Sequence, residues 1–385
     1  MGRLRALSIL AAVVGTVAIF GGASLTQAGP PASQSGPTLR ILTGWGIGGP
    51  SVNQFFGDTA LTPAGERVRV AVGTAVVWVL GSDEFHTVTF LAGGPSPKYF
   101  VNQPEGADRP PMINPQLAFP TVPDGPWNGT SFAHMEMQQP GQEFAITFGQ
   151  TGTFPYLCLF HPAMTGVVEV VATGSAGLTT QAAVDQYAQS HPVAAHQPQI
   201  DQILATRSDA VQIEGTGGQS MWFVRAGSDW RNGHMDILSF LPRDLTIRQG
   251  DTVVWYVDHV APHTVTFPAV GEPPADFILI QFGDGTVVTP PPPGEAPPPE
   301  LMARLMDPSQ DARLVIGPAG LRSMPSPTHD GRRLYNSGFI GEHPAVEPPM
   351  DKVWALTFTT PGTFRYLCVL HEPSGMEGTI TVTAR

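Results

Sequence analysis

The sequence predicts an all-β fold that consists of two tandem modules joined by a partly helical linker. The chain has 385 residues, which suits two domains of ordinary size. Its 43 glycines and 40 prolines separate short hydrophobic segments, a composition typical of strands joined by turns. One order of segments also occurs twice along the chain, since HTVTF stands at 86–90 and again at 263–267. This internal repeat favours two copies of one β module over a single large domain.

The predicted strands follow the same order in both modules. The first module, 38–173, contains runs of β-branched and aromatic residues at 66–80 (divided by Gly73-Thr74), 85–90, 143–148, 153–158 and 166–172. The second module, 210–385, repeats them at 243–257, 262–267, 352–358, 363–368 and 378–384. Each run is short and bounded by turn residues, which is the pattern of strands in a β-sandwich.

Two segments depart from this pattern. The linker at 174–209 is polar and alanine-rich, so it is predicted to contain one or two short helices interrupted near Pro192. The second module carries an insertion at about 287–330, because its spacing from the HTVTF histidine to the cysteine is 105 positions, against 72 in the first module. The insertion includes TPPPPGEAPPPE, whose prolines lack the N–H that a central strand needs, and a surface excursion is predicted there.

The first 28 residues have the layout of a secretory signal peptide. Arg3 and Arg5 precede an apolar run from about Ala6 to Phe20, and small residues follow it. An uncleaved membrane anchor is the alternative, because the apolar run approaches spanning length. We therefore expect an exported protein that is periplasmic, on the cell surface or secreted, with membrane association only if this segment stays uncleaved.

The chain is acidic, with a formal charge of −12 that becomes −14 once Arg3 and Arg5 leave with a signal peptide. An acidic surface disfavours nucleic acid as a partner, because phosphates attract basic proteins. Simple solubility explains this charge, and so does association with a basic redox partner protein.

Both cysteines of the chain stand in nearly the same setting. Cys158 is followed by His161 and Met164 in TFPYLCLFHPAM, and Cys368 is followed by a histidine and a methionine in TFRYLCVLHEPSGM. A disulfide would need neither neighbour. Thiolate, imidazole and thioether form a soft ligand set that suits copper or zinc, and the thioether favours copper.

A mononuclear blue-copper site needs a second histidine from elsewhere in the fold. His86 and His263 are the candidates, because each begins the HTVTF segment of its module. A strand would then deliver the cysteine, a tight loop would return the histidine and methionine, and a distant strand end would supply the fourth ligand. Packing that fixes such a site keeps rearrangement small during electron gain or loss, which favours an electron relay.

These residues make both modules resemble cupredoxins, the plastocyanin, amicyanin and pseudoazurin family of Greek-key β-sandwich proteins with type 1 copper. The first loop, Cys-x-x-His-x-x-Met, is similar to the short amicyanin loop, and the second, with four residues before the methionine, is similar to the plastocyanin loop. The resemblance implies two type 1 copper ions, one per module, with the predicted ligands His86, Cys158, His161 and Met164, and His263, Cys368, His371 and Met376.

The resemblance carries two further expectations. In the family the loop histidine reaches the surface, so His161 and His371 are the expected exit points for electrons. Many members also have asparagine after the strand histidine, where it ties that strand to the cysteine loop. Here Thr87 and Thr264 stand instead, and each hydroxyl is expected to make a similar bond.

The enzymatic alternatives are copper nitrite reductases and multicopper oxidases, which also contain two cupredoxin modules. Oxidases use His-x-His pairs, and both classes place a histidine beside the type 1 cysteine. This chain has no His-x-His, and the cysteine neighbours are apolar: Leu157, Leu159, Leu367 and Val369. An electron carrier is therefore favoured, and no catalytic residue is predicted.

A copper-dependent oxidoreductase and a copper storage or delivery protein remain alternatives. Further histidines stand in other segments, and an interface metal site remains open among them. The sequence HMEM at 134–137 could hold Cu(I), although apolar packing is the more common use of such methionines. The remaining histidines of this group are His234, His259, His329 and His343.

Overall fold

The computed structural model describes residues 36–104, 109–137, 140–231, 233–271, 276–291, 297–318, 320–322, 327–344, 346 and 349–385. The predicted signal peptide, 1–28, lies outside the described residues, as does part of the proline-dense stretch. Strands dominate the fold, and the all-β prediction is confirmed. Among the helices of the described ranges, none has the length and apolar character needed to cross a membrane.

The first half of the chain forms two sheet layers around one core. One layer is a five-stranded sheet ordered β3-β11-β10-β5-β8. The strands are β3 (Arg67–Ala71), β11 (Thr165–Val171), β10 (Gly152–Leu157), β5 (His86–Phe90) and β8 (Ala133–Met137). The facing layer contains β1 (Thr38–Gly46), β2 (Ser51–Phe56), β4 (Ala75–Ser82) and β9 (Glu143–Thr147).

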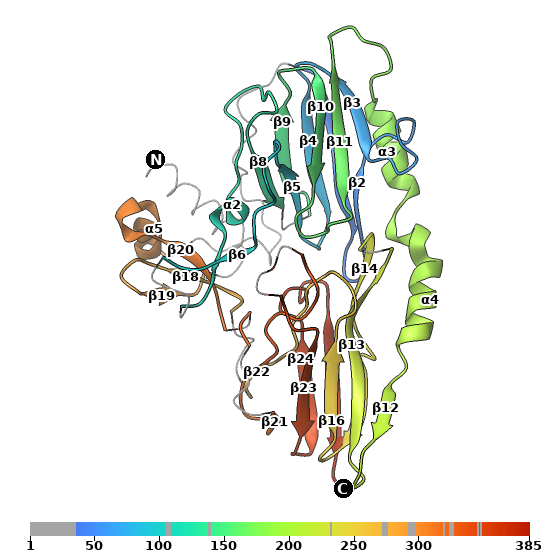
Figure 1. The fold of residues 1–385 in the computed structure, drawn as a ribbon, viewed down its shortest axis with the longest axis vertical. Helices are drawn as coiled ribbons and strands as arrows, with labels where there is room; N and C mark the ends of the chain where they lie inside the picture. Colours follow the sequence, from blue (N-terminus) through green and yellow to red (C-terminus); the bar gives the residue numbers. More distant parts are fainter. Residues whose placement is uncertain are drawn as a thin grey trace.

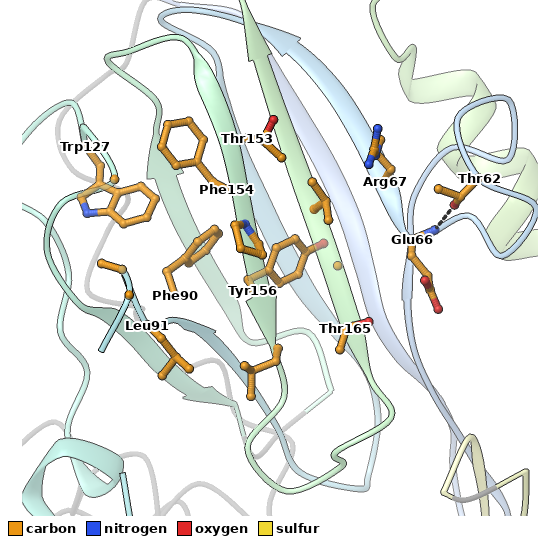
Figure 2. A pocket seen from close by; sticks show the side chains of 17 residues that line it. Thr62, Glu66, Arg67, Phe90, Leu91, Trp127, Thr153, Phe154, Tyr156 and Thr165 are labelled. Atoms are coloured by element: carbon orange, nitrogen blue, oxygen red, sulfur yellow. Dashed lines mark hydrogen bonds between the residues drawn. The ribbon is translucent and has the colours of Figure 1, made fainter. Parts of the chain in front are cut away.

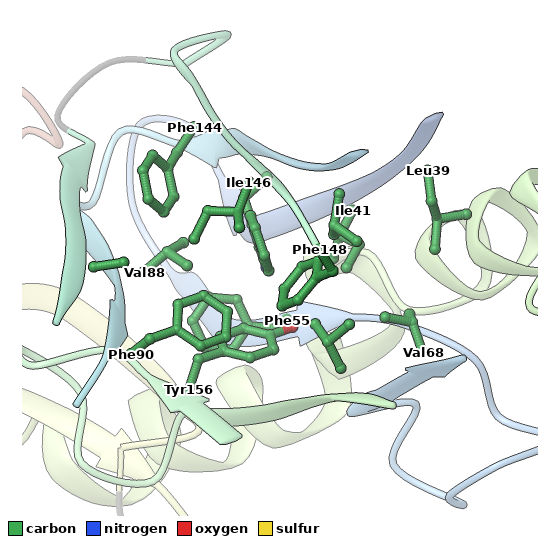
Figure 3. Packing of buried hydrophobic residues seen from close by; sticks show 14 of the residues in the cluster. Leu39, Ile41, Phe55, Val68, Val88, Phe90, Phe144, Ile146, Phe148 and Tyr156 are labelled. Atoms are coloured by element: carbon green, nitrogen blue, oxygen red, sulfur yellow. The ribbon is translucent and has the colours of Figure 1, made fainter. Parts of the chain in front are cut away.

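Alternation along these strands builds the core between the layers. In β3 the valines at 68 and 70 are buried and their neighbours are partly exposed, as expected for a strand with one face inward. Figure 3 shows the resulting packing, in which Phe90, Phe148 and Tyr156 lie together. Trp78 of β4 is fully buried, and its ring makes an edge contact with Tyr156 at 5.1 Å between centroids.

The second half repeats this arrangement. Its five-stranded sheet is ordered β15-β25-β24-β17-β22, from β15 (Asp244–Arg248), β25 (Glu377–Thr383), β24 (Gly362–Leu367), β17 (Thr266–Phe267) and β22 (Tyr335–Asn336). The facing strands are β12 (Val211–Glu214), β13 (Ser220–Trp230), β14 (Met235–Leu241), β16 (Thr252–Tyr256), β21 (Thr328–His329) and β23 (Val353–Phe358). Trp255 is fully buried here and contacts Tyr366 at 5.4 Å, so it matches the place of Trp78.

One continuous ten-stranded sheet joins the two halves. Its main path is β21-β23-β16-β13-β14-β2-β1-β4-β9, and β12 pairs with β13. The halves meet where β14 pairs antiparallel with β2, with Met235 opposite Val52 and Asp236 opposite Ser51. In Figure 1 the two halves accordingly lie end to end along the longest axis of the molecule. We call this β2–β14 junction the joint.

The linker covers the joint with helices. As expected, the segment contains two α-helices separated near Pro192: α3 (Gln181–Ser190) and α4 (Gln197–Arg207), with the short 3-10 helix η2 (Val193–His196) between them. They run along one side of both halves (Figure 1). Tyr187 and Ile200 of the helices share a buried cluster with Val52 and Met235 of the joint. This apolar contact holds the two halves together.

A third small sheet forms from connections of both halves. Its order is β19-β18-β20-β7-β6, and Val315 of β20 lies opposite Met112 of β7. The strands are β6 (Phe100–Val101), β7 (Met112–Ile113), β18 (Ile278–Gln281), β19 (Val287–Val288) and β20 (Arg313–Ile316), and nearby helical turns are α2 (Pro115–Ala118), α5 (Pro299–Met306) and η3 (Pro308–Gln310). The proline-rich excursion is thus structured in its described part and adds a second link between the halves.

Candidate metal centres

The first candidate site forms where two neighbouring strands end. His86 is the first residue of β5, and Cys158 directly follows β10, which pairs with β5 through Leu157 and Thr89. The loop after Cys158 closes on itself, because the Cys158 N–H donates to the Met164 carbonyl at 2.9 Å and the Met164 N–H donates to the His161 carbonyl at 2.8 Å. The short loop therefore returns His161 to the cysteine.

Three ligand atoms of this site form a compact triangle. Nδ1 of His86 and Nδ1 of His161 are 3.1 Å apart. The Cys158 Sγ lies 3.5 Å from His161 Nδ1 and 3.9 Å from His86 Nδ1. The point equidistant from all three lies about 2.0 Å from each, close to the lengths of about 2.0–2.1 Å for metal–nitrogen bonds and about 2.3 Å for metal–sulfur bonds. The donor set therefore fits one transition-metal ion.

The second candidate site has almost the same geometry. Nδ1 of His263 and Nδ1 of His371 are 3.1 Å apart, and the Cys368 Sγ lies 3.4 Å from His371 Nδ1 and 3.9 Å from His263 Nδ1. The longer loop is closed in the same way, since the Cys368 N–H donates to the Met376 carbonyl at 3.0 Å. All six triangle residues are buried. The duplicated spacing in the sequence has thus become a duplicated site in space.

The two methionines lie on these closed loops. Met164 is 1% exposed and Met376 is fully buried. Each accepts the cysteine N–H through its backbone carbonyl, so its position is fixed relative to the cysteine. Their part as axial ligands stays a prediction.

Thr87 and Thr264 make the bonds expected of them. The Thr87 hydroxyl accepts the Leu159 N–H at 2.7 Å, and the Thr264 hydroxyl accepts the Val369 N–H at 2.9 Å. The backbone N–H of each threonine also donates to the cysteine sulfur of its site, at 3.3 Å in both. Each threonine therefore ties its strand to the cysteine loop, which confirms the expectation from the sequence.

A glycine closes each site behind the strand histidine. Gly44 has a φ of +66°, and a Cβ there would lie 2.2 Å from Nε2 of His86. Gly227 has a φ of +74°, and a Cβ there would lie 2.2 Å from Nε2 of His263. Both glycines stand at an irregularity in strand pairing, of β1 with β2 and of β13 with β14. The backbone at each glycine therefore packs closely against the imidazole and limits where the imidazole can lie.

The electrostatics of the sites favour the form of cysteine that binds metals. Burial would raise the pKa of the Cys158 thiol, but the facing His161 outweighs burial and lowers it. Burial would lower the pKa of His161, but Cys158 and Asp236 raise it to about 10. The pKa values of Cys368 and His371 shift in the same directions. In each pair the shifts thus run toward thiolate and imidazolium, and the thiolate is the form of cysteine that binds metals.

The expectation that the loop histidines reach the surface is wrong. His161 is 3% exposed and His371 is 4% exposed, because both lie at the joint between the halves. Their Nε2 atoms approach one buried carboxylate, with Glu84 Oε1 4.0 Å from His161 and Glu84 Oε2 3.3 Å from His371. Asp236 Oδ2 lies 3.5 Å from His161 Nε2 and also accepts the Asn53 amide at 2.8 Å.

The second site has one additional histidine against it. Nε2 of His259 lies 2.9 Å from Nε2 of His263, and His259 is 5% exposed. The first site has no such neighbour, since among the described residues Nε2 of His86 is buried without a hydrogen-bond partner. The two sites therefore share their triangles and differ in what lies behind the strand histidine.

The sequence did not point to Glu84 or Asp236 as members of the site, whereas His259 was among the histidines left open for an interface metal site. Glu84 stands two residues before His86, and this proximity was the one available signal. Charged side chains are almost never fully buried unless they are paired. Only the meeting of the two halves supplies these partners, so the burial was hidden from the sequence.

His134, the histidine of the HMEM segment, has a structural role in the core. His134 of HMEM is fully buried, with Nδ1 2.8 Å from the Thr89 hydroxyl and Nε2 3.0 Å from the Leu117 carbonyl. Burial lowers its pKa to about 4, although the bond to Leu117 opposes this. Both ring nitrogens are thus engaged by protein atoms, which leaves none for Cu(I).

An apolar groove of about 650 Å³ lies over β10, along residues 153–157. Figure 2 shows Phe90, Trp127, Phe154 and Tyr156 on its lining. None of the eight predicted metal ligands lines it within the described part of the chain. The groove is therefore separate from the candidate metal chemistry.

No protein-family model and no curated protein matches the chain. Among solved structures, an oxidized mutant of amicyanin is 18% identical and covers 36% of this chain and 86% of its own, with a TM-score of 0.20. Amicyanin from Paracoccus versutus is 19% identical, with 37% and 87% covered and a TM-score of 0.20. The oxidized form of plastocyanin from Dryopteris crassirhizoma is 17% identical, with 42% and 99% covered and a TM-score of 0.19.

Proposed function

We propose that the protein is an exported electron carrier that binds one type 1 copper ion in each half. The observation that carries the proposal is the duplicated His-Cys-His triangle, whose size fits one metal ion. Copper bound there would exchange single electrons between its two oxidation states. The chain's own part is to supply a soft thiolate and two imidazoles in a buried setting that moves little.

The residues around each triangle support this reading. Thr87 and Thr264 hold the cysteine loops, and Gly44 and Gly227 block the strand histidines from moving back. A site fixed on several sides needs little rearrangement when its charge changes, which favours electron transfer. Burial of every triangle residue disfavours a storage or delivery role, since such proteins exchange their metal readily.

An enzymatic role is the second candidate. The chain lacks His-x-His, and its cysteines have leucine or valine on either side, so no imidazole leads directly from a cysteine to another metal. The joint does gather Glu84, Asp236 and His259, which are metal-binding residue types. We retain a carrier as the proposal, with redox partner proteins, and not nucleic acid, as its partners.

The test is copper loading of the chain with its metal content quantified, followed by visible absorption and paramagnetic resonance. Two copper ions per chain with the blue type 1 signature are expected. Cys158→Ser and Cys368→Ser should each remove one centre and leave the other. An additional non-blue copper would support the enzyme instead, and zinc or no bound metal would contradict the proposal.

A further inference from the structure

One buried carboxylate is placed between the two candidate sites. Glu84 is 2% exposed and follows the end of β4, two residues before the predicted ligand His86. Its two oxygens face different halves, since Oε1 lies 4.0 Å from Nε2 of His161 and Oε2 lies 3.3 Å from Nε2 of His371. In both histidines Nδ1 faces the triangle, so Nε2 is the nitrogen directed away from it. Glu84 thus approaches the outer side of one histidine from each site.

We propose that Glu84 couples the two sites electrostatically, as the one buried carboxylate that faces Nε2 of both His161 and His371, so that single electrons pass between the halves. This inference rests on the proposed function. When a ligand histidine donates its other N–H to a carboxylate, its orientation is fixed and its basicity rises. Because one carboxylate faces both histidines, at 4.0 Å and 3.3 Å, a change of charge at either site acts on a group that the other site also faces.

The residues next to Glu84 extend the link. Glu84 connects through Phe85 to His86, a predicted ligand of the first site, and so belongs to the backbone of that site. The Phe85 ring lies nearly parallel to the imidazole of His371, at 11° and 6.1 Å between centroids. The tripeptide 84–86 therefore contacts the second site while it forms part of the first.

The exchange that this link supports is balanced in electrons and atoms. One electron leaves the site that holds Cu(I), which is oxidised, and enters the site that holds Cu(II), which is reduced. No covalent bond forms or breaks, and no proton has to move, because the Nε2–H groups stay on their imidazoles. Burial of the carboxylate strengthens the coupling, since charges interact more strongly away from water.

The joint supplies a discriminating variant and a matched control. The Oδ2 atom of Asp236 lies 3.5 Å from Nε2 of His161, so Asp236→Asn tests a carboxylate beside the first site. Asp251 is 2% exposed, like Glu84, but its carboxylate accepts the Ser220 N–H and the Trp222 indole instead. Asp251→Asn therefore removes an equally buried charge away from both sites.

The experiment uses full-length protein with these two variants and Glu84→Gln. Copper affinity of each site is measured by competition titration of the metal-free protein, and each potential by spectroelectrochemical titration. Cys158→Ser and Cys368→Ser assign the signals. We expect Glu84→Gln to weaken copper binding about 10- to 100-fold at both sites. A tenfold loss of Cu(II) over Cu(I) affinity raises a potential by about 59 mV. Asp236→Asn should change the first site more than the second, which it reaches only through His259, and Asp251→Asn neither.

A measurement on the unmodified protein tests the proposal even if the Glu84→Gln variant fails to fold. After partial reduction by a radical pulse, the electron should redistribute between the two centres at a rate independent of protein concentration. A rate proportional to protein concentration would overturn the proposal. So would a folded Glu84→Gln variant in which the copper affinity of only one site, or of neither, is changed. Absence of blue copper in the unmodified protein would instead contradict the proposed function itself.

Discussion

The glycine behind the first site offers a sharp test of how the fold sets the metal geometry. Gly44→Ala adds one methyl group at a position with φ of +66°, directly against His86. Gly73→Ala is the matched control, because Gly73 has a φ of +87° and no heavy atom within 4 Å of an added Cβ. Both variants place alanine in the left-handed region, at a cost of about 1–2 kcal/mol each. Only the methyl group at position 44 would clash with another side chain, that of His86.

The size of the displacement follows from the contact. The added Cβ would lie 2.2 Å from Nε2 of His86 and 2.7 Å from the Ser82 hydroxyl. Non-bonded carbon contacts prefer about 3.5–4.0 Å, so the imidazole must move back by about 1.3 Å or more. Metal sites hold their ligand distances within about 0.2 Å. We therefore expect copper affinity at the first site to fall at least about 100-fold, the upper end of the effect of losing a partner of a ligand histidine.

The assay is copper titration followed at the visible band of each centre, with unfolding by urea measured in parallel. Gly44→Ala should lose the first centre and keep the second, while Gly227→Ala should do the reverse. Gly73→Ala should lower the free energy of unfolding and leave the copper affinity of both sites unchanged. Retention of normal copper affinity at the first site of Gly44→Ala would refute the reasoning, and so would an equal loss of copper in Gly73→Ala.

Three further results are expected. Thr87→Val leaves the buried Leu159 N–H without its acceptor, so metal-free protein should lose about 1–3 kcal/mol of unfolding free energy in urea titration; an unchanged midpoint and slope would count against the bond. His134 has a pKa of about 4 in the folded protein, against 6.5 when unperturbed. Its contribution to the free energy of unfolding is therefore fully present above pH 6.5, and about 3 kcal/mol of it is lost as the pH falls toward 4. His134→Gln should flatten that dependence, and a slope equal to that of the unmodified protein would contradict it. His259→Leu removes the neighbour of His263 Nε2 and should raise the potential of the second site alone, by about 59 mV for a tenfold change in relative affinity; a shift at the first site would show that the reasoning is incomplete.

The sequence predicted the elements that carry the candidate ligands because their patterns are local. HTVTF and the cysteine strands alternate as strands do. The observed β5 and β17 fall within the predicted segments, and β10 and β24 begin and end one residue before theirs. The linker helices were also predictable, since the segment is polar and alanine-rich and Pro192 marks the break between them. Pairing a strand histidine with a distant cysteine followed from the repeat rather than from any single motif.

No strand was predicted in the segments that form β1 and β2. Glycines at 44, 46, 48 and 49 interrupt the apolar alternation there, and one of them, Gly44, stands at the bulge that approaches His86. The two-residue strands β6 and β7 are too short for any period to appear. The pairing of β7 with β20 depends on contacts between distant connections, which a local pattern does not contain.

Burial of the loop histidines changes how the proposed carrier must meet its partners. The resemblance predicted that His161 and His371 would face solvent, as they would in an isolated module. Here the pairing of β2 with β14 brings the same ends of both halves together, and Glu84 occupies the space between the imidazoles. A partner protein therefore has to deliver electrons through other atoms of each half. The histidine edges that would serve an outside partner in a single module are, in this chain, directed at each other.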